Sequence, residues 1–289
     1  MGWEYRHLKQ RLEIQDTPPL ELFEAFCEAA FADMEDMEWS CKLVRGRLQT
    51  DRFYWLGRPA PSPTLAKHVR RLLGAMGFEP TGLPGGMKTW NALLERDSLR
   101  TLVGYAGPEP ATGRPALLKV HLTLYPHSTA ELHSRLLRPL MPELPDRPPP
   151  GRPTLLLGYL VSSREIEPRL YMLYGQSAYR RPAVRRYLEP LVGQRGLELM
   201  GSHPRAGLCL KRDGGCMLEL AFRPSGRRHV WHPSHALSPL WVPLAKLAHQ
   251  HPVVGERLER LTWVTVPTRA KDWRFPASPA EMNLYLRLR

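Results

Sequence analysis

The sequence predicts an α+β fold in which residues 1–289 form one domain, a ten-stranded antiparallel β-barrel surrounded by α-helices. Three observations predict it. Segments with alternating apolar and polar residues come in pairs, the pairs recur roughly every 50 to 60 residues, and a helical pattern follows each of the first four pairs. A supersecondary unit that repeats in this way favours a closed, cyclic architecture.

The clearest alternation lies in residues 117–125. Its even positions are aliphatic, and from position 119 its odd positions are Lys119, His121, Thr123 and Tyr125. A strand presents successive side chains to opposite faces, so this segment has one apolar and one polar face. Two basic groups, a hydroxyl and a phenol suit an enclosed anion site with an aromatic wall. A solvent-facing sheet surface is the alternative interpretation.

The same patterns locate the remaining elements. The ten expected strands are Met37–Arg45, Leu48–Leu56, Leu99–Tyr105, Ala116–Tyr125, Thr154–Val161, Pro168–Tyr174, Pro204–Lys211, Cys216–Arg223, Leu261–Pro267 and Met282–Leu288. Helices are expected over Pro18–Ala30, Pro63–Phe78, Thr129–Leu140, Pro182–Val192 and Ser234–His249. A propeller blade would need four strands and no helix, and a TIM barrel would need single parallel strands between helices, so an antiparallel barrel fits better.

Helices outside a barrel require an apolar outer face, so the polar face of each strand should line the interior. The expected interior residues of the other strands are Glu38, Ser40, Lys42, Thr50, Arg52, Tyr54, Gly207, Cys209, Lys211, Glu219, Ala221, Arg223, Asn283, Tyr285 and Arg287. Solvated surfaces would be richer in Glu, Lys, Ser and Asp. This composition therefore favours a lined cavity over a solvated sheet.

Net charge and hydropathy narrow the classes of partner. The chain has a formal net charge of +13 and a pI of about 9.9, which suggests an anionic partner: nucleic acid, a membrane surface or a phosphorylated small molecule. A GC-rich genome would also enrich arginine. No apolar run approaches the ~20 residues of a membrane span, and the N-terminus lacks an apolar signal core, so we expect a cytoplasmic protein without a membrane partner.

Cysteine and histidine spacing argues against a resident metal. The four cysteines form no CxxC pair, and Cys209 and Cys216 could face each other across a hairpin but should stay reduced. His229, His232 and His235 invite a metal interpretation, yet Pro233 and the lack of a neighbouring cysteine or carboxylate oppose it. We therefore expect no protein-held metal.

Several short motifs, in order along nearly the whole chain, resemble those of one family. They are Pro19–Phe26, Glu38–Lys42, Arg52-Phe53, Lys119–His121, Leu210-Lys211, Trp263-Val264 and Leu284-Tyr285. Together they resemble the cyanobactin peptide prenyltransferases, enzymes of ribosomal peptide biosynthesis with the ten-stranded ABBA barrel. The resemblance implies a monomeric enzyme that transfers an isoprenoid from its pyrophosphate to a side chain of a ribosomally made, cyclic peptide.

The resemblance also implies roles for individual residues. Arg52, Lys119 and Lys211 match the pyrophosphate-binding positions, with His121 beside them, and Glu38 matches the acidic position that acts as general base. Strand facing adds Arg223 and Arg287 to the pyrophosphate site, and adds Tyr54, Tyr171 and Tyr285 as aromatic shields for an allylic cation. No DDxxD motif is present, so Mg²⁺ would act only by neutralising the pyrophosphate donor.

Two departures from the family pattern bear on substrates. Glu219 and Ala221 stand where family members often carry tyrosines, and a second interior carboxylate at Glu219 suits a histidine or arginine acceptor better than tyrosine or tryptophan. Ala206 and Gly207 replace bulky aromatics near the pocket floor. With Ala221 as the expected neighbour of Gly207, this predicts room for geranyl rather than dimethylallyl.

Three other functions remain open at this point. The segments Tyr179–Tyr187 and Arg223–His229 are basic and carry aromatic residues, which would suit nucleic-acid binding. No recognised nucleic-acid motif accompanies them, so we expect that the protein binds no nucleic acid. A barrel prenyltransferase acting on free small aromatics is a second alternative, and a structural module with a filled barrel is a third.

Overall fold

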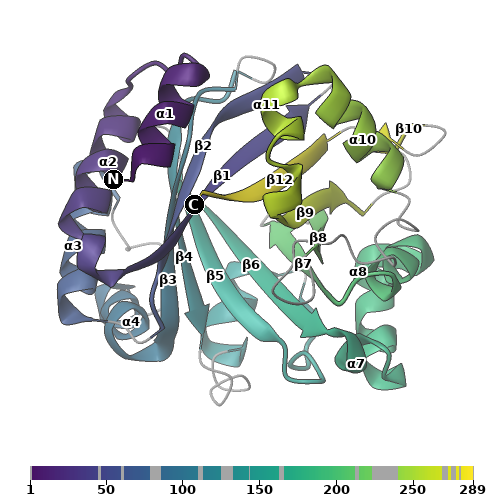
Figure 1. Ribbon diagram of the computed structural model, residues 1–289. Helices are drawn as coiled ribbons and strands as arrows, with labels where there is room; N and C mark the ends of the chain where they lie inside the picture. Colours follow the sequence, from purple (N-terminus) through teal and green to yellow (C-terminus); the bar gives the residue numbers. More distant parts are fainter. Residues whose placement is uncertain are drawn as a thin grey trace.

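The computed structural model describes residues 2–44, 47–59, 62–78, 86–109, 113–124, 133–142, 144–162, 166–211, 215–222, 240–268, 273–274, 278–279 and 281–288. Ten strands close a barrel in the order β1-β12-β9-β8-β7-β6-β5-β4-β3-β2, and every neighbouring pair is antiparallel. The predicted fold class is confirmed. Figure 1 shows the strands at the centre and the helices outside them.

The barrel strands lie close to the predicted segments. They are β1 (Met34–Val44), β2 (Arg47–Gly57), β3 (Ser98–Ala106), β4 (Leu117–Leu124), β5 (Thr154–Val161), β6 (Ile166–Gly175), β7 (Arg205–Lys211), β8 (Cys216–Ala221), β9 (Leu261–Pro267) and β12 (Glu281–Leu288). Strands β10 (Trp273–Arg274) and β11 (Ser278–Pro279) form a separate two-stranded sheet. Strands that are consecutive along the chain are also neighbours in the barrel, and helices lie in the connections β2–β3, β4–β5, β6–β7 and β8–β9.

Helices cover the barrel between successive strand pairs (Figure 1). They are α1 (Trp3–Arg11), α2 (Pro18–Ala29), α3 (Pro63–Ala75), α4 (Gly86–Ala92), α6 (Arg138–Leu140), α7 (Gln176–Tyr179), α8 (Pro182–Gly201), α10 (Trp241–Gln250) and α11 (Pro252–Gly255). Short 3-10 and π segments adjoin them at Phe31–Asp33, Leu93–Asp97, His133–Leu137 and Leu258–Arg260.

Helices α2 and α3 begin with the same local chemistry. The hydroxyl groups of Thr17 and Ser62 accept hydrogen bonds from the backbone N–H groups of Leu20 and Leu65, and a proline follows each cap. Such caps satisfy backbone donors that the first helical turn leaves unpaired. Both helix starts are as the sequence predicts.

Several helical regions differ from the prediction. Helices α1, α4, α7 and α11 are not predicted from the sequence, and the nine residues of α1 bury only Tyr5 and Leu8. The predicted Pro182–Val192 helix continues to Gly201 across a kink at Gly193, which has a φ of 69°. The predicted helices over 129–140 and 234–249 begin outside the described residues.

The outer face of the barrel is the hydrophobic core. Trp39, Phe53 and Trp55 are fully buried there, with Phe53 against the ring of Tyr5 at 4.6 Å and Trp55 against Phe26 at 5.1 Å between ring centroids. Packing the apolar faces against helices removes them from water, which stabilises the closed barrel. It also leaves the polar faces of the strands to the interior.

One bulge changes which residues face inward. The pairing of β1 with β2 shifts between Ser40 and Lys42, so that Ser40 lies opposite Arg52 while Lys42 lies opposite Gln49. An extra residue in one strand exchanges its two faces on one side of the bulge. Gln49 therefore lines the interior, and the prediction that Thr50 does so is wrong.

Candidate active site

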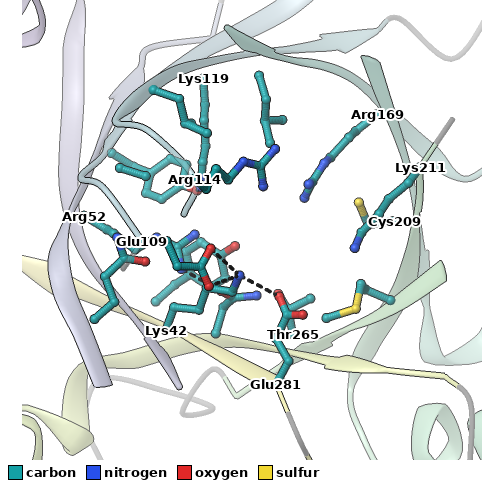
Figure 2. Close-up of a pocket in the computed structure, with 18 of the residues that line it drawn as sticks. Lys42, Arg52, Glu109, Arg114, Lys119, Arg169, Cys209, Lys211, Thr265 and Glu281 are labelled. Carbon is teal, nitrogen blue, oxygen red and sulfur yellow. Dashed lines mark hydrogen bonds and ion pairs between the residues drawn. The ribbon is translucent and has the colours of Figure 1, made fainter. Parts of the chain in front are cut away.

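The polar strand faces line two cavities stacked inside the barrel. The first, which we call the cationic cavity, has a volume of about 540 Å³ and carries six basic side chains: Lys42, Arg52, Arg114, Lys119, Arg169 and Lys211 (Figure 2). The second, which we call the acceptor cavity, has a volume of about 480 Å³ and is lined by residues including Glu38, His121, Thr123, Ala221 and Trp263. The polar strand faces therefore line cavities inside the barrel, as predicted, and do not form a solvated sheet surface.

Four residues line both cavities and form a dividing layer between them: Tyr54, Tyr171, Glu219 and Tyr285. The rings of Tyr54 and Tyr285 lie 5.4 Å apart between centroids. Burial raises the pKa of each of the three phenols, so all three are neutral near pH 7. The layer is therefore an uncharged aromatic ring with one carboxyl group in it.

Three basic residues of the cationic cavity are bonded to carboxylates of the chain. Lys42 contacts Glu109 and Glu281, at 3.0 and 3.1 Å. Arg114 and Arg169 both donate to Glu167, at 2.6 and 3.0 Å. These cations are neutralised from within the protein.

The other three basic residues have no carboxylate within ion-pair distance among the described residues. Arg52 donates to the amide oxygen of Asn283 at 2.6 Å, and Lys119 donates to the hydroxyl of Tyr54 at 2.7 Å. The Nε atom of Arg52 is buried without a hydrogen-bond partner. Lys211 lies at the end of β7 beside Arg169 on β6. These are three of the six residues predicted to bind pyrophosphate, and the structure brings them together around one cavity.

The surroundings of Lys119 destabilise its charged form. Burial, together with the charges of Arg52 and Arg169, holds the pKa of Lys119 well below its ordinary range. Its ammonium group lies 5.1 Å from the ring centroid of Tyr54. A buried cation among other cations is costly unless a counter-charge joins it, so the arrangement favours the binding of an anion.

Glu38 lies in the acceptor cavity, on β1 opposite Tyr54 of β2 and Arg287 of β12. It is buried, and its Oε1 atom accepts a hydrogen bond of 2.9 Å from the hydroxyl of Thr262. A buried carboxylate held in one orientation beside an aromatic layer has the geometry of a general base.

Glu219 is the carboxyl group of the dividing layer. Its Oε2 atom accepts a hydrogen bond of 3.0 Å from Thr265. Burial raises the pKa of Glu219 to about 8, although Thr265, Arg169 and Lys119 oppose the shift. The group can therefore accept or donate a proton close to neutral pH.

Two predicted pyrophosphate residues lie away from the cationic cavity. His121 lines the acceptor cavity, 4.9 Å from the ring of Tyr171 between centroids, and burial, Lys119 and Arg169 lower its pKa to about 3. It is therefore a neutral imidazole, not a cation. Arg287 also lines the acceptor cavity and contacts Asp36 at 3.3 Å. The assignment of both residues to the anion site is corrected.

Gly207 does not provide free volume. It pairs with Glu219, not with Ala221, and an added Cβ would lie 2.1 Å from the carbonyl oxygen of Met172. Strand β6 approaches so closely there that only glycine fits. The prediction of space at Gly207 is wrong, whereas Ala221 does line the acceptor cavity.

Sequence reasoning missed several charged residues of the cationic cavity. Arg169 had a usable signal, because it has the same strand parity as Tyr171. Arg114 and Glu109 come from the connection between β3 and β4, and no strand pattern could place them.

Other predicted features lie elsewhere. Arg223, the histidines at 229, 232 and 235, and the basic segment 223–229 fall outside the described residues. In the other basic segment, Tyr179 and Tyr187 are buried in the core while Arg180, Arg181 and Arg185 are exposed. Buried tyrosines cannot stack on bases, so this segment is a basic helix face without the aromatic partners that the nucleic-acid alternative needs.

The donor set gives little support for a magnesium site held by protein ligands alone. Among the described residues, no group of three or more His, Cys, Asp or Glu side chains is placed to hold a metal ion. The carboxylates at the cationic end, Glu109 and Glu281, both contact Lys42. Mg²⁺ that arrived with a pyrophosphate would be part of the substrate.

Comparisons with known proteins give similarities in structure but none in sequence families. No family model and no curated protein matches the chain. Among solved structures, the crystal structure of AnaPT from Neosartorya fischeri matches with a TM-score of 0.48 and 11% identity, over 87% of this chain and 77% of that one. Among the described residues, no helix combines the length and apolar character needed to cross a membrane. The assignment of the barrel rests on its strand pairing, and the function must be argued from its interior.

Proposed function

We propose that the protein is a prenyltransferase that moves an isoprenoid from its pyrophosphate to a nucleophilic side chain of a ribosomally made peptide. One observation carries the proposal. Among the described residues, Arg52, Lys119 and Lys211 have no carboxylate within ion-pair distance; they lie on one side of a tyrosine layer, and the buried carboxylate Glu38 lies on the other. An anion site, an aromatic layer and a base thus follow one another through the barrel. Prenyl transfer requires this order, because the allylic cation forms between the leaving pyrophosphate and the acceptor that loses its proton.

The first step is departure of the leaving group. The bond between C1 of the isoprenoid and its pyrophosphate oxygen breaks, and the electron pair leaves with the pyrophosphate. Negative charge on that oxygen grows in the transition state, so fixed cations accelerate the step. Arg52, Lys119 and Lys211 would supply this stabilisation, and Mg²⁺ would add to it as part of the donor.

The tyrosine layer would protect the allylic cation that forms. Tyr54, Tyr171 and Tyr285 present neutral rings at the boundary between the cavities. Aromatic faces stabilise a cation, and a buried layer keeps water from capturing it.

The second step joins the isoprenoid to the acceptor. A nucleophilic atom of the peptide side chain attacks the allylic carbon, and Glu38 takes the proton that this atom releases. The acceptor cavity carries Glu219 as a second carboxyl group close to the tyrosines. We therefore favour histidine or arginine as the acceptor, because both carry N–H groups that can donate to carboxyl oxygens; tryptophan and tyrosine are the other candidates.

The acceptor cavity also bears on donor length. Leu156, Leu173 and Ala221 line it as apolar groups, and a ten-carbon chain would bury more surface there than a five-carbon chain. Each additional buried CH₂ contributes up to about 0.8 kcal/mol. On this basis we favour geranyl over dimethylallyl, with the space now attributed to Ala221 and not to Gly207.

Mass spectrometry tests the proposal. The protein is incubated with geranyl or dimethylallyl pyrophosphate, Mg²⁺, and a panel of cyclic and linear peptides that contain His, Arg, Trp or Tyr. A mass increase of one isoprenoid on a peptide, localised by fragmentation, is the expected result. Transfer to free indoles or phenols but to no peptide would reassign the enzyme to small aromatic acceptors. No transfer to either would contradict prenyl transfer.

A further inference from the structure

The rim of the cationic cavity contains a lysine that its own chain already neutralises. Lys42 donates to both carboxylate oxygens of Glu109, at 3.0 and 3.2 Å, and contacts Glu281 at 3.1 Å. Figure 2 shows this cluster on the edge of the same space that Arg52, Lys119 and Lys211 line. Among the described residues, Lys42 has carboxylates within ion-pair distance, whereas those three cations have none.

The two carboxylates reach Lys42 from different places. Glu281 is on β12, whose residues 282 and 283 pair directly with β1 beside Lys42. Burial alone would raise the pKa of Glu281, but the charges of Lys42 and Lys211 outweigh it and hold this pKa below its ordinary value. Glu109 comes instead from the connection between β3 and β4, so it is not part of a barrel strand.

The fold holds Glu109 in this position. Its backbone N–H donates to the carbonyl oxygen of Arg114 at 2.8 Å. The preceding Gly107 donates to the carbonyl oxygen of Asp51 on β2 at 2.9 Å, and its own carbonyl oxygen accepts from Gln49 at 2.8 Å. A Cβ at position 107 would lie 1.5 Å from Asp51 Oδ2, so glycine permits this close approach. The carboxylate of Glu109 is therefore preorganised on Lys42.

A carboxylate in this place competes with the ligand that the cavity favours. Carboxylate and phosphate oxygens are alternative acceptors for the same ammonium group. The cavity has six basic side chains against three carboxyl groups, and Arg52 Nε is buried there without a hydrogen-bond partner. Both features indicate an anionic ligand in the space beside Lys42.

We propose that Lys42 is a further phosphate subsite of the cationic cavity and that Glu109 is its built-in competitor, which a diphosphate displaces when it binds. The inference rests on the proposed function in taking a pyrophosphate as the ligand. Exchange of one anionic acceptor for another keeps the ammonium group of Lys42 paired throughout, which avoids leaving a buried charge alone. It also lowers the affinity for released pyrophosphate, because Glu109 returns to Lys42 as the product leaves.

Binding of inorganic pyrophosphate, measured by titration calorimetry, tests the proposal without requiring an acceptor. Glu109→Gln keeps the shape of the side chain and removes the competing charge, so the affinity should rise roughly tenfold, as for other coupled sites. Lys42→Gln should lower the affinity. In the Lys42→Gln background, which leaves no ammonium group to compete for, Glu109→Gln should change the affinity less than about twofold.

Glu256→Gln is the matched control, because Glu256 contacts Arg11 on the outer helices at 2.7 Å, and it should leave pyrophosphate binding unchanged. The double variant Lys42→Gln/Glu109→Gln replaces this ion pair by two neutral amides, and thermal unfolding of each variant checks that it is folded.

Two results would overturn the subsite. One is an unchanged or reduced affinity in Glu109→Gln. The other is an equal increase in both backgrounds, which would show a general effect of charge that does not act through Lys42. Absence of pyrophosphate binding in wild type and in every variant would contradict the anion site itself, and with it the proposed function.

Discussion

The two cavities of the barrel use the same ten strands but differ in which charges the chain neutralises. At the cationic end, Glu109, Glu167 and Glu281 neutralise Lys42, Arg114 and Arg169, while Arg52, Lys119 and Lys211 are left without carboxylates among the described residues. At the mouth of the acceptor cavity, Arg100 contacts Glu35 at 2.6 Å and Arg287 contacts Asp36 at 3.3 Å. Deeper inside, Glu38 and Glu219 accept hydrogen bonds from threonines.

The difference between the cavities indicates which ligand each one favours. Paired charges report how the protein stabilises itself, whereas buried charges with neutral partners carry a desolvation cost that a ligand can relieve. By that criterion the cationic cavity favours an anion, and the acceptor cavity favours a group with N–H or O–H donors. Substitutions in the two cavities test this division.

Glu38→Gln should reduce prenyl transfer by roughly 10²–10⁴-fold, because it removes the proposed base while keeping the side-chain shape. The measurement is the rate of product formation under saturating donor, with donor affinity measured separately and expected to remain near wild type. Glu35→Gln is the control on the same strand, since Glu35 is paired with Arg100 at the mouth. A normal rate in Glu38→Gln, with an intact fold, would remove Glu38 from the mechanism.

We expect each of three single substitutions, Arg52→Ala, Lys119→Ala and Lys211→Ala, to weaken donor binding and to slow the reaction. In each variant the two effects combined should lower kcat/KM by roughly 10- to 10³-fold. Both quantities should fall because the charge on the leaving group grows in the transition state. Arg70→Ala, which removes an outer ion pair with Glu95, should change neither. If all three variants bound donor normally, the pyrophosphate would have to lie elsewhere.

Glu219 should give the protein a distinctive dependence of stability on pH. Its pKa in the folded protein is about 8, above the ordinary value of 4.5, so the folded state binds more protons than the unfolded state between these values. The free energy of unfolding should therefore fall as pH rises from about 5 to 8, by an amount on the order of 3 kcal/mol, and Glu219→Gln should abolish this fall.

Urea unfolding at a series of pH values measures the effect of Glu219. Glu281→Gln provides the contrast, because the pKa of Glu281 is lowered and its contribution is lost only as pH falls below its ordinary pKa of about 4.5. Its difference from wild type should therefore stay constant between pH 5 and 8. A Glu219→Gln variant whose stability parallels wild type over that range would contradict the raised pKa.

Ala221→Leu should lower the preference for geranyl over dimethylallyl by about tenfold, because the larger side chain fills apolar space that several CH₂ groups would otherwise occupy. Competition between the two donors in one reaction measures the ratio directly. Ala106→Leu is the matched control at the cationic end, where it should affect both donors alike. An unchanged ratio in Ala221→Leu would place the end of the isoprenoid elsewhere.

Much of the interior could be predicted because strand alternation is a local property. Alternation places Lys119 and His121 on the same face of their strand, and only the direction of that face, inward or outward, depends on the rest of the fold. The same rule fails at Gln49 and Thr50, where a bulge shifts the register. It also fails at Gly207, whose lack of a side chain is used for a close approach of Met172 and not for space.

The ten strands, their antiparallel arrangement and most of the polar residues that face inward could be predicted from the sequence. These depend on residue periodicity and on neighbours along the chain. The division of the polar residues between two cavities, and the pairing of some cations with carboxylates, depend on the tertiary structure. Glu109 reaches Lys42 across 67 positions of sequence, and Arg52 reaches Asn283 across 231. Closure of the barrel creates such contacts, and with them the burial that shifts the pKa values of Lys119, His121 and Glu219. No local pattern records them, because burial and ion pairing depend on all ten strands at once.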